Sequence, residues 1–159
     1  MNDRYYSKQS NQTGSRFLNM NKANELEQRL LLRKIQPTSM RLLVLDCLVQ
    51  QEAAVSLSDL EKLLSRSDRI TLYRTMKTFE EKGLVHQIHD NSGIAKFALC
   101  ATDCSCSYPD DVHIHFYCSP CDTTYCMPQL SVPHFDLPEN FRADSGNFVI
   151  SGHCPSCSA

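Results

Sequence analysis

Two pairs of cysteines near the C-terminus have the spacing of a metal site. Cys118 and Cys121 form one C-x-x-C motif, and Cys154 and Cys157 form a second. Each motif can direct two thiolates at one tetrahedral Zn²⁺, and four such ligands make a closed structural site. Disulfides are the alternative, which a reducing compartment disfavours. The spacing therefore predicts one structural Zn²⁺ per chain, which holds a proline-interrupted segment that cannot be one long helix.

A second group of possible ligands lies upstream. His113 and His115 are two residues apart, so in a strand both imidazoles lie on one face. Two exposed polar positions are the ordinary explanation of such a pair, but thiols and imidazoles are crowded around it: Cys100, Cys104, Cys106, His86 and His89. Thiolate and imidazole ligands suit Zn²⁺ better than Mn²⁺ or Fe²⁺, which accept more oxygen.

Charge and cysteine divide the chain into two parts. The 159 residues are 42% hydrophobic and 21% charged, as in ordinary globular proteins. Residues 1–90 carry 14 Lys and Arg against 11 Asp and Glu, whereas residues 91–159 carry 2 against 7. Eight of the nine cysteines follow residue 90. We predict a polar, disordered arm over 1–21, a first domain over 22–99 and a cysteine-rich domain over 100–159. The start lacks a signal-peptide pattern and no apolar run could span a membrane, so a cytoplasmic protein without a membrane partner is expected.

Helix signals dominate the first domain. Apolar spacing predicts a helix over 22–35, and Thr38 can cap a second one. A third opens with a capping box from Ser58 to Glu61, and a fourth runs from a cap at Asp68 to Gly83. Two β-capable runs, 84–89 and 94–99, flank the turn sequence at 90–93. Helices followed by a hairpin predict an α+β chain that begins with a winged helix-turn-helix.

The fourth helix carries a basic face. Arg69, Tyr73, Arg74 and Lys77 lie opposite its apolar stripe. A solvated surface is the simplest interpretation of such a face. In a winged helix, however, this helix enters the major groove of double-stranded DNA, where Arg and Tyr reach bases and phosphates. The modest positive charge of the domain indicates that DNA binding depends on dimerisation.

These motifs together resemble the ferric uptake regulator (Fur) family of metal-responsive repressors. The matching segments are Thr38-x-x-Arg41, Asp68-Arg-Ile-Thr-Leu-Tyr-Arg-Thr-Met, Glu81-Lys-Gly-Leu-Val, His113-x-His-Phe-Tyr-Cys-x-x-Cys and Gly152-His-Cys-x-x-Cys. The resemblance implies a winged helix, a C-terminal α/β dimerisation domain stapled by a four-cysteine zinc site, and a regulatory metal site near the hinge. It also implies that Tyr73 and Arg74 contact DNA from the recognition helix and that Arg41 contacts the DNA backbone.

The resemblance is strongest to zinc uptake regulator (Zur) members. Gly83-Leu-Val-His86 and Phe97-Ala-Leu-Cys100 are similar to segments of their sensing site. The implied sensing ligands are His86, Cys100, His113 and His115, with His89 or Asp90 as alternatives to His86, because one residue of register decides which side chain faces the hinge.

The sequence also departs from the family pattern. Val112 and Ile114 stand where iron sensors build a further site, and Cys126 stands roughly where the family often has Glu. Prolines interrupt 130–141, where the family has a long dimerisation helix. Cys104 and Cys106 lie in an atypical insertion, which is either a surface loop or a source of alternative ligands or redox thiols.

The expected function is a homodimeric repressor that binds a palindromic operator with Zn²⁺ as corepressor. An iron sensor is one alternative. A thiol-based redox regulator that uses Cys104, Cys106 or Cys126 is another. A zinc-ribbon interaction module would show no operator affinity. An enzyme is not expected, because no H-x-E motif accompanies the C-x-x-C pairs as in zinc deaminases.

Overall fold

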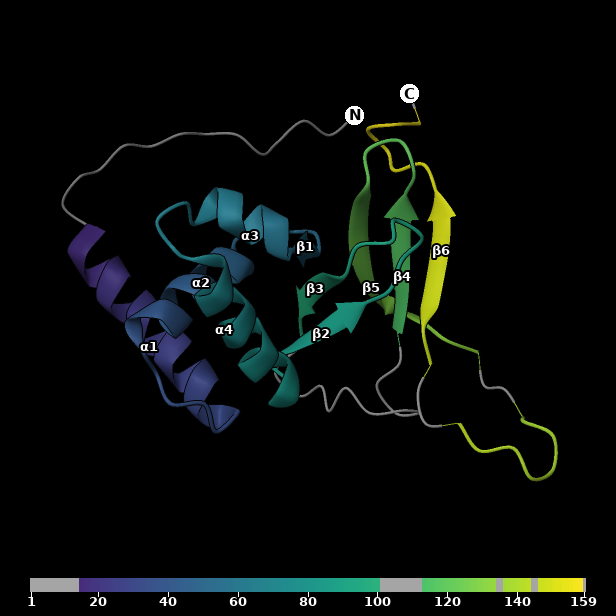
Figure 1. Ribbon diagram of the computed structural model, residues 1–159, viewed down its shortest axis with the longest axis horizontal. Coiled ribbons are helices and arrows are strands. Elements are labelled where there is room, and N and C mark those ends of the chain that lie inside the picture. Colours follow the sequence, from purple (N-terminus) through teal and green to yellow (C-terminus); the bar gives the residue numbers. More distant parts are fainter. Residues whose placement is uncertain (1–14, 101–112, 134–135, 144–145, 159) are drawn as a thin grey trace, which may run out of the picture.

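The computed structural model describes residues 15–100, 113–133, 136–143 and 146–158. Helices gather on one side of the molecule and a second sheet lies on the other, with a β-hairpin between them (Figure 1). The helices are α1 (Ser15–Leu32), α2 (Ser39–Val49), α3 (Leu57–Leu63) and α4 (Arg69–Glu81). The strands are β1 (Val55–Ser56), β2 (Val85–Ile88), β3 (Lys96–Leu99), β4 (His113–Cys118), β5 (Thr123–Ser131) and β6 (Phe148–Gly152). The predicted α+β fold with an N-terminal winged helix-turn-helix is confirmed.

Two expected helix starts are corrected. Helix α1 begins at Ser15, so 15–21 is helical although the sequence assigned it to the arm, and 1–14 lies outside the described residues. The capping box of α3 joins Ser56 to Asp59, not Ser58 to Glu61. Ser56 is still extended as part of β1, so its side chain is free to accept from the Asp59 amide at 3.1 Å.

Helix α1 ends at Leu32, three residues before the predicted end at 35, whereas the predicted caps of α2 and α4 are observed. The Thr38 side chain caps α2 by accepting from the amide of Arg41, and the Asp68 side chain caps α4 by accepting from the amide of Thr71 at 2.9 Å. Gly83 follows α4 with φ +64°, a left-handed conformation that glycine adopts without a Cβ penalty. Helix α4 therefore ends where the hairpin must begin.

An apolar core joins the helices to the hairpin. Leu45, Leu72 and Phe79 are fully buried, and Leu84 and Val85 at the start of β2 belong to the same cluster. This packing fixes α4 against the base of the hairpin, which β2 and β3 form. Strand β1 pairs with β3, so the first sheet has the order β1-β3-β2. Any displacement of β2 and β3 is thus transmitted to α4.

The second sheet has the order β5-β4-β6. Strand β4 pairs antiparallel with β5, with His115 opposite Cys126, and parallel with β6, with Cys118 opposite Gly152. The sequence predicts an α/β domain in the second half of the chain. The described residues after Leu99 form strands and turns, so they show the β part of that domain. The described part of 130–141 is strand and irregular chain, in keeping with its prolines.

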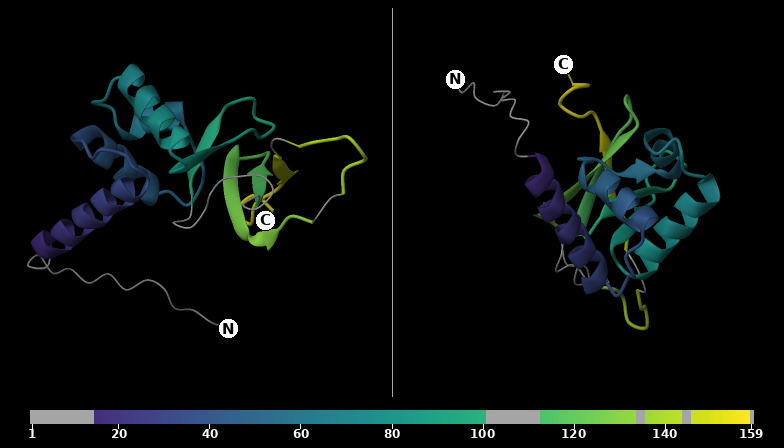
Figure 2. Two further views of the ribbon diagram at one scale, coloured as in Figure 1. Left: turned by 90° about the horizontal axis from the view of Figure 1, so that it is seen from below. Right: turned by 90° about the vertical axis from the view of Figure 1, so that its left-hand side faces the viewer.

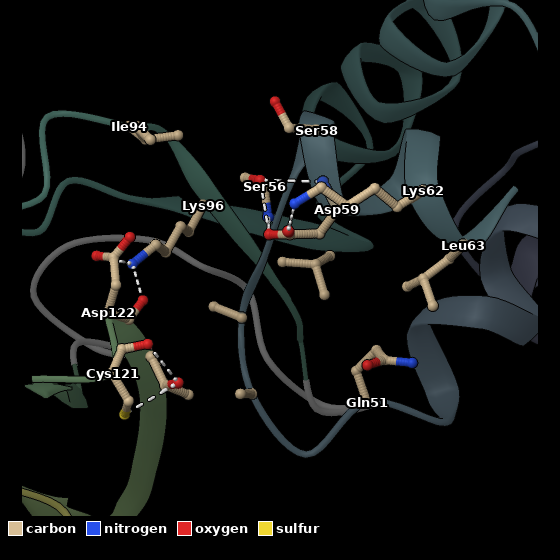
Figure 3. A pocket seen from close by; sticks show the side chains of 14 residues that line it. Gln51, Ser56, Ser58, Asp59, Lys62, Leu63, Ile94, Lys96, Cys121 and Asp122 are labelled. Carbon is tan, nitrogen blue, oxygen red and sulfur yellow. Dashed lines mark hydrogen bonds and ion pairs between the residues drawn. The ribbon is translucent and has the colours of Figure 1, made fainter. Parts of the chain in front are cut away.

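The hairpin and the second sheet are in direct contact, and the left view of Figure 2 shows them side by side. The Asn91 side chain in the turn of the hairpin donates to the Ser151 hydroxyl at 2.8 Å, and the Asn147 side chain donates to the His89 carbonyl at 2.7 Å. Beside the hairpin, the amide of Ala54, which precedes β1, donates to the Thr124 carbonyl at 2.8 Å. Beside these contacts a cavity of about 410 Å³ lies between α3 and the β4–β5 turn (Figure 3). The two halves therefore meet through polar contacts around a partly hollow joint.

None of the described helices has the length and apolar character needed to cross a membrane.

Candidate metal centres and DNA-binding helix

Four cysteines converge at one end of the second sheet. Cys118 ends β4 and Cys121 lies in the following turn, while Cys154 and Cys157 follow β6. The parallel pairing of β4 with β6 brings the two motifs together, since Cys118 lies opposite Gly152. The four Sγ atoms lie within 4.8 Å of one another, and the Cys121 and Cys154 sulfurs are 3.8 Å apart.

This geometry fits a tetrahedral zinc ion. A Zn–S bond of about 2.3 Å gives a separation of about 3.8 Å between two sulfurs of a tetrahedron. Hydrogen-bond contacts with Thr123 and Cys118 lower the pKa of Cys121 to about 6, whereas contacts with Cys154 and Cys121 raise that of Cys157 to about 12. Four thiolates cannot be accommodated together without a cation, so the donor set suits a structural Zn²⁺.

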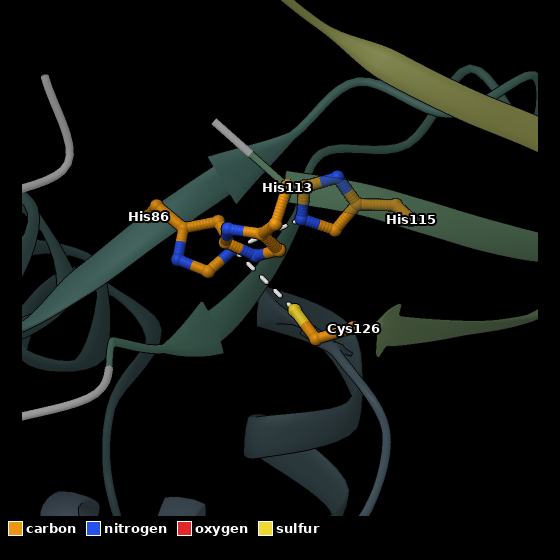
Figure 4. Close-up of side chains that lie close together, drawn as sticks. All are labelled: His86, His113, His115 and Cys126. Carbon is orange, nitrogen blue, oxygen red and sulfur yellow. Dashed lines mark hydrogen bonds between the residues drawn. The ribbon is translucent and has the colours of Figure 1, made fainter. Parts of the chain in front are cut away.

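A second cluster lies where the hairpin meets the second sheet (Figure 4). It contains His86 from β2, His113 and His115 from β4, and Cys126 from β5. The Nε2 atoms of His86 and His115 are 3.0 Å apart, and the Cys126 sulfur is 3.4 Å from the same His86 nitrogen. One ligand atom from each of the four residues lies within 4.8 Å of all the others.

These distances also fit a metal ion. Zn–N bonds of about 2.0 Å and a Zn–S bond of about 2.3 Å give tetrahedral edges of about 3.3 Å between nitrogens and about 3.5 Å between nitrogen and sulfur. His115 is buried, and burial together with the neighbouring His113 and His86 lowers its pKa to about 4. Its imidazole is therefore neutral near pH 7, the form that binds metal.

The cluster contains Cys126, whereas Cys100, the thiol that the sequence predicted as a ligand, lies beside it. The structure unites His86, His113 and His115 as expected, but the Cys100 sulfur contacts Nδ1 of His86 at 3.3 Å, the ring nitrogen that faces away from Cys126. Cys100 follows the end of β3, where its amide bonds to the Leu84 carbonyl at the base of the hairpin. Cys126 instead lies directly opposite His115 in the second sheet.

The sequence contained a signal for Cys126, because it stands where the family often has a carboxylate. Only the strand register shows that this position faces His115. The alternative ligands lie elsewhere: His89 is exposed, and Asp90 forms an ion pair with Lys96. Cys104 and Cys106 lie outside the described residues.

Helices α3 and α4 form the helix-turn-helix, and α4 presents the predicted basic face. Arg69, Tyr73, Arg74 and Lys77 are all exposed. Arg69 pairs with Glu61 of α3, and Lys77 pairs with Glu80 at 2.9 Å. Such ion pairs at the protein surface contribute little to stability.

Arg41 lies in the first turn of α2, where its guanidinium donates to the Gln36 carbonyl at 2.7 Å. This holds the side chain at the chain segment that precedes α2. A matching DNA contact is not tested by the geometry and stays a prediction.

Comparison with known proteins identifies the family. The sequence profile described as "Ferric uptake regulator family" matches residues 33–135. Among solved structures, a zinc uptake regulator complexed with zinc and DNA is 20% identical, with 87% of this chain and 94% of that chain covered and a TM-score of 0.60. The ferric uptake regulator of Vibrio cholerae is 20% identical, with 80% and 98% covered and a TM-score of 0.55. That of Pseudomonas aeruginosa, solved with manganese, is 19% identical, with 82% and 98% covered and a TM-score of 0.55. No curated protein sequence matches.

Proposed function

Because this chain belongs to the ferric uptake regulator family of metal-responsive DNA-binding regulators, we propose that it is a zinc-sensing repressor with Zn²⁺ as its corepressor. One observation supports this most directly: the cluster of His86, His113, His115 and Cys126 joins the hairpin of the DNA-binding half to the second sheet. Occupancy of that cluster would thereby bear on the position of α4.

The donor set favours zinc over the other metals that the family senses. Three imidazoles and one thiolate form a soft, four-ligand site, whereas Fe²⁺ and Mn²⁺ accept more oxygen ligands. Cys126 supplies sulfur at this cluster, and the Cys100 thiol supports His86 from the opposite side of its ring. A hydrogen bond from Nδ1 of His86 to Cys100 would leave Nε2 with its lone pair free for a metal.

The residues of the cluster suggest how metal and DNA binding are coupled. When bound, Zn²⁺ supplies coordinate bonds between side chains that belong to different halves of the protein. His86 then holds β2, and the packing of Leu84 and Val85 against Phe79 holds α4 relative to the second sheet. In a homodimer this fixes the spacing of two recognition helices on a palindromic operator. A change from mostly incompetent to mostly competent dimers requires about 5 kcal/mol of differential metal affinity.

The four-cysteine cluster has a different role in this proposal. Cys118, Cys121, Cys154 and Cys157 hold a structural Zn²⁺ that binds more tightly than the regulatory ion, because all its ligands come from one half of the protein. Tyr73 and Arg74 contact bases, and Arg41, Arg69 and Lys77 contact the phosphate backbone.

Metal analysis and DNA binding test the proposal. Protein purified anaerobically should contain two zinc ions per chain, one of them resistant to mild chelation. A duplex selected from a random-sequence pool by the zinc-loaded protein then serves as the DNA probe, titrated in buffered Zn²⁺, Fe²⁺ and Mn²⁺. Zinc should support binding at the lowest free concentration, and the selected sequences should be palindromic. Binding that responds to Fe²⁺ but not to Zn²⁺ would contradict the proposal.

Two further experiments test the alternative ligand His89 and the alternative function as a redox regulator. His86→Ala should abolish the zinc response, while His89→Ala, a substitution at an exposed residue of the same hairpin, should leave it unchanged. The opposite pattern would identify His89 as the ligand. Peroxide titration with thiol counting distinguishes a redox regulator, which would release DNA as a disulfide forms, from a zinc sensor that keeps its DNA until metal is lost.

A further inference from the structure

A buried lysine lies between the two halves, on a different part of the hairpin from His86. Lys96 begins β3, and its side chain is only 5% exposed. Its ammonium group lies 3.0 Å from a carboxylate oxygen of Asp90 and 3.2 Å from one of Asp122. It also donates to the Asp122 carbonyl at 2.6 Å (Figure 3) and to the Thr124 hydroxyl at 3.2 Å.

These partners come from both sides of the joint. Asp90 belongs to the turn of the hairpin, and its side chain is fully buried, whereas Asp122 and Thr124 belong to the β4–β5 turn and the start of β5. The Thr124 hydroxyl also bonds to the Asp90 carboxylate. A buried ammonium group is stable only while such partners surround it, so the arrangement requires the hairpin and the turn to stay together.

The turn that holds Lys96 also carries a metal ligand. Asp122 directly follows Cys121 and has φ +57°, a left-handed conformation that aspartate adopts more readily than most residues other than glycine. The carbonyl that Lys96 binds is therefore set by the path of the chain immediately after the Cys121 thiol. Folding of the C-x-x-C turn around a metal fixes that path, and an unfolded turn would leave Lys96 and Asp90 without their partners from the second sheet.

The cavity near α3 leaves the Lys96 contacts with little apolar packing beside them. It is lined by Lys96, Cys121 and Asp122 together with residues of α3 and β1, so apolar packing does not fill this side of the joint. Cys121 is exposed. The halves are held together here by polar contacts, which are sensitive to the position of a single turn.

We propose that Lys96 forms a second joint between the hairpin and the second sheet, controlled by the four-cysteine site and independent of the histidine cluster. Metal at the cysteines keeps Asp122 and Thr124 in place around Lys96, and loss of that metal releases the turn of the hairpin. The four-cysteine site thus acts on the DNA-binding half as well as stapling its own domain. The inference requires metal at the cysteines but does not require zinc sensing at His86.

Hydrogen exchange of the full-length protein tests this joint. The experiment uses a His86→Ala background, so that the histidine cluster cannot hold the hairpin. Exchange of residues 85–99 is measured with the cysteine site loaded and again after strong chelation. We expect at least a tenfold faster exchange after chelation. In Lys96→Met, which keeps the length of the side chain but removes its charge, exchange should already be fast with the metal bound and should rise little further.

Control variants keep the result interpretable. Lys62→Met changes an exposed lysine on the same cavity and should behave like the parent protein. Asp122→Asn should give an intermediate rate, because it keeps the carbonyl acceptor and removes the charge, and it serves if Lys96→Met fails to fold. Retention of one zinc per chain, measured by metal analysis, shows that the variants keep the cysteine site. Slow hairpin exchange in metal-loaded Lys96→Met and Asp122→Asn, or no change on chelation in the parent, would overturn the proposal.

Discussion

Replacing Cys126 and Cys100 separately with serine tests which thiol binds the regulatory metal. The Cys126 sulfur is 3.4 Å from Nε2 of His86, close to the edge of a zinc tetrahedron, so Cys126→Ser removes a direct ligand. Cys100 contacts Nδ1 of His86 at 3.3 Å and acts through that ring. Loss of a partner of a ligating histidine costs about 10–100-fold in affinity, or about 1.4–2.7 kcal/mol. We expect Cys100→Ser to fall in this range and Cys126→Ser to exceed it.

Cobalt spectroscopy makes the distinction independent of affinity. With zinc kept in the four-cysteine site, Co²⁺ added to the histidine cluster should show a sulfur-to-cobalt charge-transfer band. The band should disappear in Cys126→Ser and persist in Cys100→Ser. Cys47→Ser, at a partly buried cysteine outside both clusters, is the matched control and should change neither band nor affinity. A band that survives in Cys126→Ser but vanishes in Cys100→Ser would refute the assignment and restore Cys100 as the ligand.

Three predictions concern stability. Phe79→Ala leaves a cavity at a fully buried position between α4 and the hairpin and should cost about 3–5 kcal/mol in urea unfolding. Asp68→Ala removes the cap that the Thr71 amide requires and should cost about 1 kcal/mol, seen as a lower thermal midpoint with α4 otherwise intact. Burial opposes ionisation of Asp90, but hydrogen bonds and the Lys96 ion pair outweigh it and lower its pKa from 3.8 to about 2. Its contribution is present above about pH 4 and is lost as the pH falls toward 2, so the stability of Asp90→Asn should fall less steeply than that of the parent over this interval; equal slopes would contradict the role of the carboxylate.

Local signals predicted the DNA-binding half well. Thr38, Asp68 and Gly83 mark helix ends through interactions with their immediate neighbours in the chain, which a sequence displays directly. The sequence predicts the capping box of α3 two residues too late, because Ser58 and Glu61 satisfy the same pattern as Ser56 and Asp59. Only the pairing of β1 with β3, a contact distant in sequence, shows that the chain is still extended at Ser56.

The metal sites show the same limit. The C-x-x-C motifs carry their own spacing, so all four cysteines of the first cluster were predicted correctly. The second cluster collects side chains from three strands, and its membership depends on which residues of β4 and β5 face each other. Cys100 and Cys126 both lie beside His86, and sequence alone offers no register with which to separate them. The sequence does not predict the ion pairs of Lys96 for a similar reason, since an isolated lysine in a hairpin normally points to solvent.

The parallel pairing of β4 with β6 has a consequence for synthesis of the protein. The winged helix and strands β4 and β5 leave the ribosome before β6, so during translation β4 has one open edge and only two of its four metal-binding thiols. Open strand edges invite pairing with other chains. A nascent polypeptide stalled before Phe148 would therefore combine a folded DNA-reading head with a tail whose central strand is open on one side, and addition of β6 covers β4 and supplies the last two cysteines.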